Sequence, residues 1–205
     1  MASNVITPEF RVSYPRVFKP EKNDLSGEME FTVSALFKKG ENLSALKKAA
    51  EEACEEKWGK DKSKWPKNLK SPFKDQGTRE KEKEVVEIKN GKETKTVKTV
   101  MPDGYEKGAM YLNLKSRQKP GLVDQSLNDI IDASEFYGGC YARASVRAMA
   151  YDMKVNKGVS FWLQNLQKTR DGESFGGRTA PQDDFEPIAA AGAEASTGES
   201  DDIFG

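Results

Sequence analysis

The sequence predicts a mainly β protein, built as a small antiparallel barrel of five strands with one α-helix. Five short segments alternate apolar and polar residues at the period of a half-buried strand, with turn-forming residues between them. Only one segment repeats its apolar residues at the spacing of a helix. Strands and helices do not alternate as they would in a parallel α/β sheet, which favours a small antiparallel barrel or sandwich, and a five-stranded barrel is the economical choice of the two.

The first two strands are expected to form a long hairpin. Residues 10–18, "FRVSYPRVF", alternate Phe10, Val12 and Tyr14 against Arg11 and Ser13. Pro15 lacks a backbone N–H, which predicts an edge or a bend in this strand. Residues 29–37, "MEFTVSALF", alternate in the same way after the turn-rich stretch "KPEKNDLSGE".

The helix is predicted over residues 42–59. Its apolar residues recur at steps of three and four and form one stripe: Leu43, Leu46, Ala50, Ala53, Cys54 and Trp58. Asn42 has the residue type of an N-cap, and Gly59 has the type that ends a helix. We expect the stripe to pack against the sheet.

Residues 60–108 are mostly polar and indicate an insertion. Within "EVVEIKNGKETKTV", Asn90 and Gly91 lie between two alternating segments, which is a strong indication of a tight hairpin. Because the ribbon has few apolar residues, we expect it to project from the domain.

The remaining three strands follow the insertion. "GAMYLNLKS" and "VSFWLQNLQK" each alternate, and "CYARASVRAMAYD" alternates over a dozen residues with small apolar side chains on one face. Residues 124–133 are expected to form a short helix or turn. Gly138 and Gly139 would permit the bulge or sharp coil that a small closed barrel needs.

The composition argues against an enzyme. The chain has no histidine, which excludes imidazole-based acid–base catalysis and imidazole-ligated zinc. No nucleophile elbow, phosphate-binding loop or dinucleotide fingerprint is present, so we expect no catalytic residue, metal or cofactor. No apolar run is long enough to span a membrane, and residues 1–11 do not resemble a secretory signal. Cys54 and Cys140 match no metal-binding spacing, which favours reduced thiols in a cytoplasmic protein.

The zero net charge conceals a strong segregation of charge. Residues 1–178 hold all 33 basic residues and 26 of the 33 acidic ones, an excess of seven positive charges. Residues 179–205 hold seven acidic residues and no basic one. A basic body with an acidic arm suggests a polyanionic partner and a charged interaction tail.

One face of the predicted strand at residues 141–151 carries rings and guanidinium groups. Tyr141, Arg143, Arg147 and Tyr151 share the face opposite the small apolar residues, so they are expected to point outward. Bases stack on aromatic rings, and arginines pair with phosphates, which makes this a candidate single-strand-binding surface. The alternative is a solvated face whose arginines pair with acidic residues of a neighbouring strand.

Other basic and aromatic residues support the same interpretation. From Lys57 to Lys74 the chain holds seven lysines and one acidic residue, interleaved with aromatic rings. The alternative here is a surface loop whose rings pin it to the core. The candidate DNA-binding residues outside the Tyr–Arg face are Lys64, Trp65, Lys67, Phe73, Lys74, Tyr111, Lys115, Arg117 and Trp162. Because no recognition helix is evident, we expect sequence-independent, salt-dependent binding to flexible single strands.

The last residues, "GESDDIFG", follow a stretch too poor in apolar residues to fold. Seven negative charges mimic a phosphate chain, so this tail is expected to compete with nucleic acid for the basic groove. The residues expected to bind a partner protein are Asp201, Asp202, Ile203 and Phe204, an apolar pair next to two carboxylates. The alternative is a terminus without function.

Several of these segments are similar to the single-stranded DNA-binding proteins of tailed bacteriophages. The similar stretches are "GAMYLNLKS", "YGGCYARASV", "KGVSFWLQNLQKTRDGESFGG" and the acidic end "DDIFG". The resemblance implies an oligonucleotide/oligosaccharide-binding (OB) fold over residues 1–178, with the insertion at 60–108, and a disordered acidic tail over 179–205. It also implies a non-enzymatic role in phage DNA replication, recombination and repair in the cytoplasm of the infected bacterial host. The implied partners are single-stranded DNA and replication or recombination proteins recruited by the tail, with no membrane.

The sequence leaves other functions open. An RNA-binding or annealing module on the same scaffold would use the same residues, and a scaffold protein would use the basic face to bind an acidic partner. A nuclease is the least favoured alternative, because the spacing of the carboxylates suggests no metal cluster. Self-association also stays open.

Overall fold

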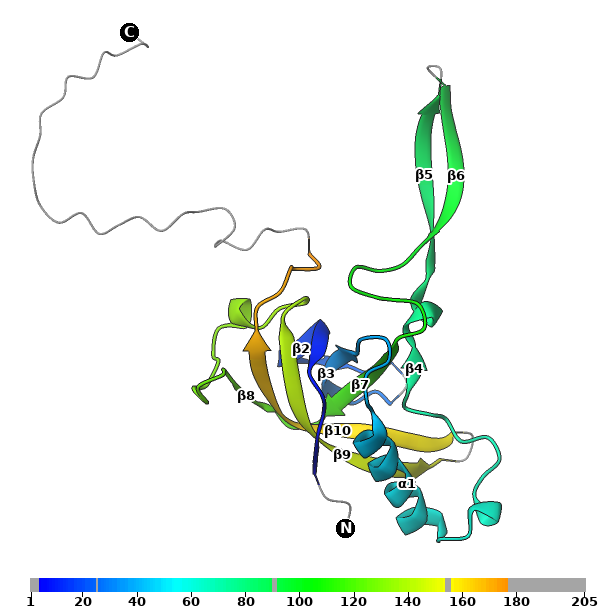
Figure 1. Cartoon of the computed structure of the whole chain (residues 1–205), viewed down its shortest axis with the longest axis vertical. Coiled ribbons are helices and arrows are strands. Elements are labelled where there is room, and N and C mark those ends of the chain that lie inside the picture. The colour runs from blue at the N-terminus through cyan, green and yellow to red at the C-terminus, as the bar shows by residue number, and fades with distance from the viewer. Residues whose placement is uncertain (1–3, 25, 90–91, 154–155, 177–205) are drawn as a thin grey trace, which may run out of the picture.

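The structure is a computed structural model that describes residues 4–24, 26–89, 92–153 and 156–176. Five long strands close into a ring in the order β9-β2-β3-β7-β10-β9 (Figure 1). The ring strands are β2 (Phe10–Lys22), β3 (Met29–Leu36), β7 (Met110–Ser116), β9 (Tyr141–Asp152) and β10 (Lys157–Arg170). Neighbours in the ring are antiparallel except β7 and β10, which are parallel. The predicted five-stranded OB-type barrel is therefore confirmed.

Three short strands extend the ring, and the sequence did not predict them. β1 (Val5–Ile6) pairs with β9, β4 (Lys74–Asp75) pairs with β7, and β8 (Gly121–Val123) pairs in parallel with β10. Three 3₁₀ turns lie in the connections, at Lys62–Lys64, Gln76–Arg79 and Ala133–Glu135. The predicted helix or turn at 124–133 is a turn, in which Val123 and Asp129 form an isolated bridge.

The core fills the ring because the inward positions of each strand are apolar. Phe10, Leu112 and Phe161 are essentially inaccessible to solvent, and so are the small residues Ala142 and Ala144 of β9. A register shift between Leu163 and Asn165 lets the longest strand, β10, bend around the barrel.

Helix α1 (Ser44–Trp58) covers the barrel beside β9 (Figure 1). Its buried residues are Leu46, Ala49, Ala50, Ala53 and Cys54, which confirms the predicted stripe. The Asn42 carboxamide accepts a hydrogen bond from the Ser44 N–H at 3.0 Å. Gly59 ends the helix with φ of +88°, a conformation in which a side chain would be strained.

The insertion divides into a projecting ribbon and a part that packs on the barrel. β5 (Lys81–Lys89) and β6 (Lys92–Val100) form a separate antiparallel sheet that extends away from the ring (Figure 1), as predicted. Asn90 and Gly91 lie outside the described residues. Gln76, in contrast, is buried, and its amide donates to the carbonyls of Phe37 (2.9 Å) and Met110 (2.8 Å). The insertion is therefore partly integral to the fold.

Residues 171–176 follow β10, and two of their backbone groups hydrogen-bond to Arg11 and Gly138. The Arg11 guanidinium donates to the Glu173 carbonyl at 2.9 Å, and the Phe175 N–H donates to the Gly138 carbonyl at 2.9 Å. Gly139 has φ of +116°, and a Cβ there would lie 2.0 Å from the Glu173 carbonyl oxygen. Glycine is required at this position both for its backbone conformation and for the close approach.

Both cysteines are free and buried. Burial raises the pKa of the Cys140 thiol to about 11 and also raises the pKa of the Cys54 thiol. Within the described ranges, no cluster of three or more His, Cys, Asp or Glu side chains is suited to hold a metal ion. No helix in that part of the chain has the length and apolar character needed to cross a membrane. The acidic tail, including Asp201, Asp202, Ile203 and Phe204, lies outside the described residues.

Candidate nucleic-acid interface

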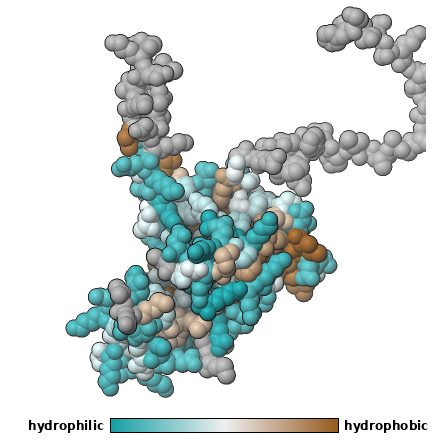
Figure 2. Space-filling model, turned by 180° about the vertical axis from the view of Figure 1, so that it is seen from behind, coloured by the Kyte–Doolittle hydropathy of each residue, from teal (hydrophilic) through white to brown (hydrophobic). Residues whose placement is uncertain are grey.

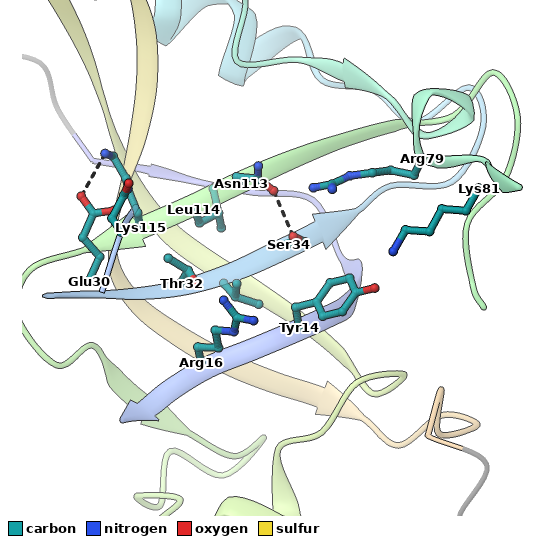
Figure 3. Close-up of a pocket in the computed structure, with 12 residues that line it drawn as sticks. Tyr14, Arg16, Glu30, Thr32, Ser34, Arg79, Lys81, Asn113, Leu114 and Lys115 are labelled. Atoms are coloured by element: carbon teal, nitrogen blue, oxygen red, sulfur yellow. Dashed lines mark hydrogen bonds and ion pairs between the residues drawn. The ribbon is translucent and has the colours of Figure 1, made fainter. Parts of the chain in front are cut away.

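A groove runs over the outer face of β2, β3 and β7, with a volume of about 490 Å³ (Figure 3). Most of its lining residues are cationic or small and polar, namely Arg16, Asn23, Thr32, Ser34, Arg79, Lys81, Asn113 and Lys115, and the others are Tyr14, Glu30, Val33 and Leu114. The side chains of Arg79 and Lys81 extend from the insertion into the groove, at the end where Tyr14 lies (Figure 3). The groove thus joins the barrel to the start of the projecting ribbon.

A bulge in β2 places Tyr14 at this groove. Ser13 pairs with Ser34 and Arg16 pairs with Thr32, so Tyr14 and Pro15 together stand opposite Val33 and β2 carries one extra residue there. Tyr14 has φ of +47° and is 53% exposed. The predicted alternation is therefore wrong at Tyr14, which does not share the buried face of Phe10 and Val12. A bulky residue in this backbone region is strained, and such strain clusters at functional sites.

Glu30 lies at the bottom of one end of the groove. Although Glu30 is only 4% exposed, its two carboxylate oxygens accept hydrogen bonds from Lys115 Nζ (3.1 Å) and Asn23 Nδ2 (2.7 Å). The buried carboxylate fixes the position of the Lys115 ammonium, which stays about one-third exposed. A fixed cation at the rim of an open groove suits the binding of a phosphate.

Arg79 carries a donor without an acceptor. Its guanidinium lies 5.1 Å from the centre of the Tyr111 ring, and its Nε–H is buried and has no hydrogen-bond partner among the described residues. Burying a donor without an acceptor costs free energy, so the Arg79 side chain would gain a hydrogen bond by moving to meet a phosphate or base carbonyl in the groove.

The cationic surface continues from the groove around the barrel. Thr32 pairs with both Arg16 and Lys115, and Trp162 pairs with both Lys115 and Arg147. Paired residues on neighbouring strands share a face, so these five side chains form one outward-facing row across five strands. We call this the basic row: Arg16, Thr32, Lys115, Trp162 and Arg147.

Trp162 is the aromatic member of the basic row. It is half-buried, and the Lys115 ammonium and the Arg117 guanidinium lie 5.9 and 5.5 Å from its ring centre. An aromatic ring among cations is the combination that binds single strands, because bases stack on the ring while phosphates pair with the cations.

The comparisons with known proteins agree with this geometry. A family model described as Enterobacter phage Enc34, ssDNA-binding protein, matches residues 3–201. The chain belongs to this family. No curated protein sequence matches it.

Solved structures of phage single-stranded DNA-binding proteins share the fold. The bacteriophage Enc34 protein in complex with ssDNA is similar with a TM-score of 0.59 and 20% identity, over 84% of this chain and 89% of that one. Gp2.5 of bacteriophage T7, a single-stranded DNA-binding protein, has a TM-score of 0.52 and 13% identity, over 88% of this chain and 99% of that one.

In this member of the Enc34 family, the predicted Tyr–Arg face of β9 does point outward, but its residues differ in accessibility. The Tyr141 ring is half-buried, with the Arg170 guanidinium 3.3 Å and the Arg11 guanidinium 5.8 Å from its centre. Arg143 is exposed and donates to Gln167 Oε1 at 2.8 Å. Tyr151 is half-buried opposite Gly158, so Arg147 is the member of this face that joins the basic row.

The predicted rings of the lysine-rich loop serve the core. Trp65 packs against the core, and its Nε1–H donates to the Gly59 carbonyl at 2.8 Å. Phe73 meets Phe161 edge-on, with ring centres 5.9 Å apart. This agrees with the alternative in which the rings anchor the loop to the barrel. Trp65 and Phe73 are therefore not part of the proposed site.

The loop's lysines and Tyr111 also lie apart from the groove. Lys64, Lys67 and Lys74 are exposed, and Lys64 Nζ lies 3.6 Å from Asp61. Tyr111 points outward from β7 but is 3% exposed, because the ring of Tyr105 covers it edge-on at 6.2 Å. Tyr111 is therefore part of a second apolar cluster.

Of the groove residues, sequence reasoning identified only Lys115, and the main ones it missed are Tyr14, Arg16, Arg79 and Lys81. One indication was available, because Pro15 predicted the irregularity in β2. The direction of the Tyr14 side chain depends on the bulge, however, and the position of Arg79 depends on how the insertion packs.

Proposed function

We propose that the protein binds single-stranded DNA without sequence preference, along the groove and the basic row. The observation that carries this proposal is the continuous row of cations around Trp162, which adjoins a groove with a buried, unpartnered arginine donor. The phosphates would contact Arg16, Lys115 and Arg147, and unstacked bases would reach Trp162 and Tyr14.

We further propose that binding protects single strands during phage DNA replication, recombination and repair in the cytoplasm of the infected host. Membership in the Enc34 family supports this role. In the same proposal, the acidic tail (residues 179–205) competes with DNA for the cationic surface and recruits partner proteins through its last apolar pair. The seven negative charges of the tail and the excess positive charge of the body support the competition.

Binding of a labelled oligothymidine, measured by fluorescence anisotropy over a salt series, tests the proposal. Six cations line the groove or surround Trp162: Arg16, Arg79, Lys81, Lys115, Arg117 and Arg147. Each phosphate contact to a single strand contributes about −0.7 to the slope of log K against log salt, so the slope should lie between about −2 and −4. No binding at low salt, or a slope near zero, would contradict the proposal.

A pair of matched variants locates the site. Arg79→Met with Lys81→Met removes two groove cations and should weaken binding and flatten the salt slope by about 1.4. Lys47→Met with Lys48→Met removes the same charge from the exposed side of α1 and should leave binding nearly unchanged. Equal effects of the two pairs would mean that only net charge matters. Competition by RNA of equal length separates DNA binding from an RNA-binding role.

A further inference from the structure

A loop on one flank of the barrel combines negative charge with exposed aliphatic side chains. From residue 120 to residue 142 the chain has no lysine or arginine but four acidic residues, all between residues 124 and 135. Leu127 and Ile131 of this acidic-apolar loop (residues 124–135) are 70% and 84% exposed. Figure 2 shows a strongly hydrophobic patch on the flank of the barrel that carries the connection after β8.

The acidic-apolar loop is held in its shape by internal hydrogen bonds. The Asp124 carboxylate accepts from the backbone N–H groups of Ser126 (2.7 Å) and Asn128 (2.9 Å), and Asp132 accepts from the Ser134 N–H (2.8 Å). Leu127 has φ of +68°, a region that a bulky residue rarely adopts. The loop thus holds an aliphatic side chain in solvent on a strained backbone, which favours an interaction surface.

A surface of complementary character lies between α1 and β9. This α1–β9 groove has a volume of about 410 Å³ and a floor of Ala53, Ala148 and Ala150. Met149, which is 45% exposed, adds an adaptable apolar wall, and the rim carries Lys57, Arg147 and Glu56. The acidic-apolar loop and α1 lie on different flanks of the barrel (Figure 1), so one molecule can use both at once.

We propose that the acidic-apolar loop of one copy docks into the α1–β9 groove of the next copy on the same DNA strand. The aliphatic pair would cover the alanine floor while the carboxylates face Lys57, which leaves Arg147 to the DNA. Such a contact joins two different surfaces, so it can repeat from one copy to the next and produce a row of molecules along the strand. The inference rests on the proposed function, because the strand is what holds neighbouring copies side by side.

Binding measurements with a long and a short oligothymidine distinguish the proposed contact between copies from the proposed DNA binding. A short strand that holds one copy measures the proposed function alone, whereas a long strand also reports contact between neighbours. Leu127→Ser with Ile131→Ser should leave the affinity for the short strand within about twofold. The cooperativity on the long strand should fall about tenfold or more, because two aliphatic side chains leave the contact. Ala133→Ser, in the same loop, is the control and should change neither.

The charged rim provides an independent test. Lys57→Glu should reduce cooperativity as the loop variant does, and adding Asp129→Lys to it should restore part of the loss. Arg147 is unsuitable for this purpose because it belongs to the basic row. The inference is overturned if the wild-type protein fills the long strand without cooperativity, or if the loop variant remains as cooperative as the wild type. Failure to bind the short strand would instead overturn the proposed function.

Discussion

Trp162 gives the sharpest test of the basic row, because it is the aromatic residue of that row. Its position in the structure also differs from that of the other tryptophans. Trp162→Ala removes a half-buried ring that faces outward, whereas Trp58 and Trp65 both pack against the core. Stacking of one base on an aromatic side chain contributes about 1–3 kcal/mol. Lys115 and Arg117 already lie beside the Trp162 ring, so a base must share the ring with these two cations. We therefore expect a stacking free energy in the lower part of that range. An affinity loss of about 5- to 30-fold corresponds to about 1–2 kcal/mol.

The salt dependence distinguishes stacking from charge. Trp162→Ala removes no cation, so the slope of log K against log salt should stay unchanged while the whole line shifts to weaker binding. Arg117→Met should instead flatten the slope by about 0.7. Anisotropy titrations at four or five salt concentrations measure both quantities for each variant.

Intrinsic fluorescence provides the matched control. Oligothymidine should quench the emission of the wild-type protein, Trp162→Phe should abolish most of the quenching, and Trp65→Phe should retain it, because Trp65 is tied to the Gly59 carbonyl. If Trp162→Ala binds within twofold of the wild type and Trp162→Phe is still quenched, the basic row is not the path of the strand.

Three further outcomes are expected. Deleting residues 179–205 should raise DNA affinity about 3- to 10-fold at low salt, with the gain vanishing in high salt as the tail's charges are screened; weaker binding would contradict the competition. In native protein at pH 8, Cys140 should react with a thiol reagent over 100 times more slowly than in denaturant, because a pKa of about 11 leaves roughly one thiolate per thousand. Hydrogen bonds from Arg170 and Thr169 lower the pKa of Glu9. The stability this gives is present above the ordinary pKa of about 4.3 and is lost as the pH falls through the lowered value. Glu9→Gln should therefore reduce the free energy of unfolding at pH 7, by under about 1 kcal/mol for a half-exposed pair, and match the wild type near pH 2 in urea titrations.

The barrel was predictable because burial of one face imposes a period of two on each strand. Phe31, Val33 and Ala35 of β3 show this, because these alternate residues are buried in the barrel whichever segments cover the outer face. The helix stripe and the Asn90–Gly91 hairpin are local patterns of the same kind. These patterns locate the elements and the inward residues of each one.

The outer face was harder to predict, because its accessibility depends on segments distant in the sequence. Tyr111 points outward as the alternation requires, yet Tyr105 of the insertion buries it. Conversely, Tyr14 became accessible through a β-bulge that adds one residue to β2, and no local pattern specifies the direction in which the side chain then points. Trp162 and Lys115 were both identified from the sequence. Only the parallel register of β7 and β10 shows that they are neighbours.

Three cations of the site are already paired in the free protein, and this affects how DNA would bind. Arg16 lies 2.8 Å from Glu21, Lys115 lies 3.1 Å from Glu30, and Arg117 lies 2.5 Å from Glu28. Because each phosphate would replace or share a carboxylate, the electrostatic gain per contact is smaller than for a free cation, while the side chains lose less conformational freedom on binding. A binding surface of this kind favours exchange of the bound strand over very high affinity. That property suits the proposed function, in which the protein covers a single strand and also interacts with other proteins.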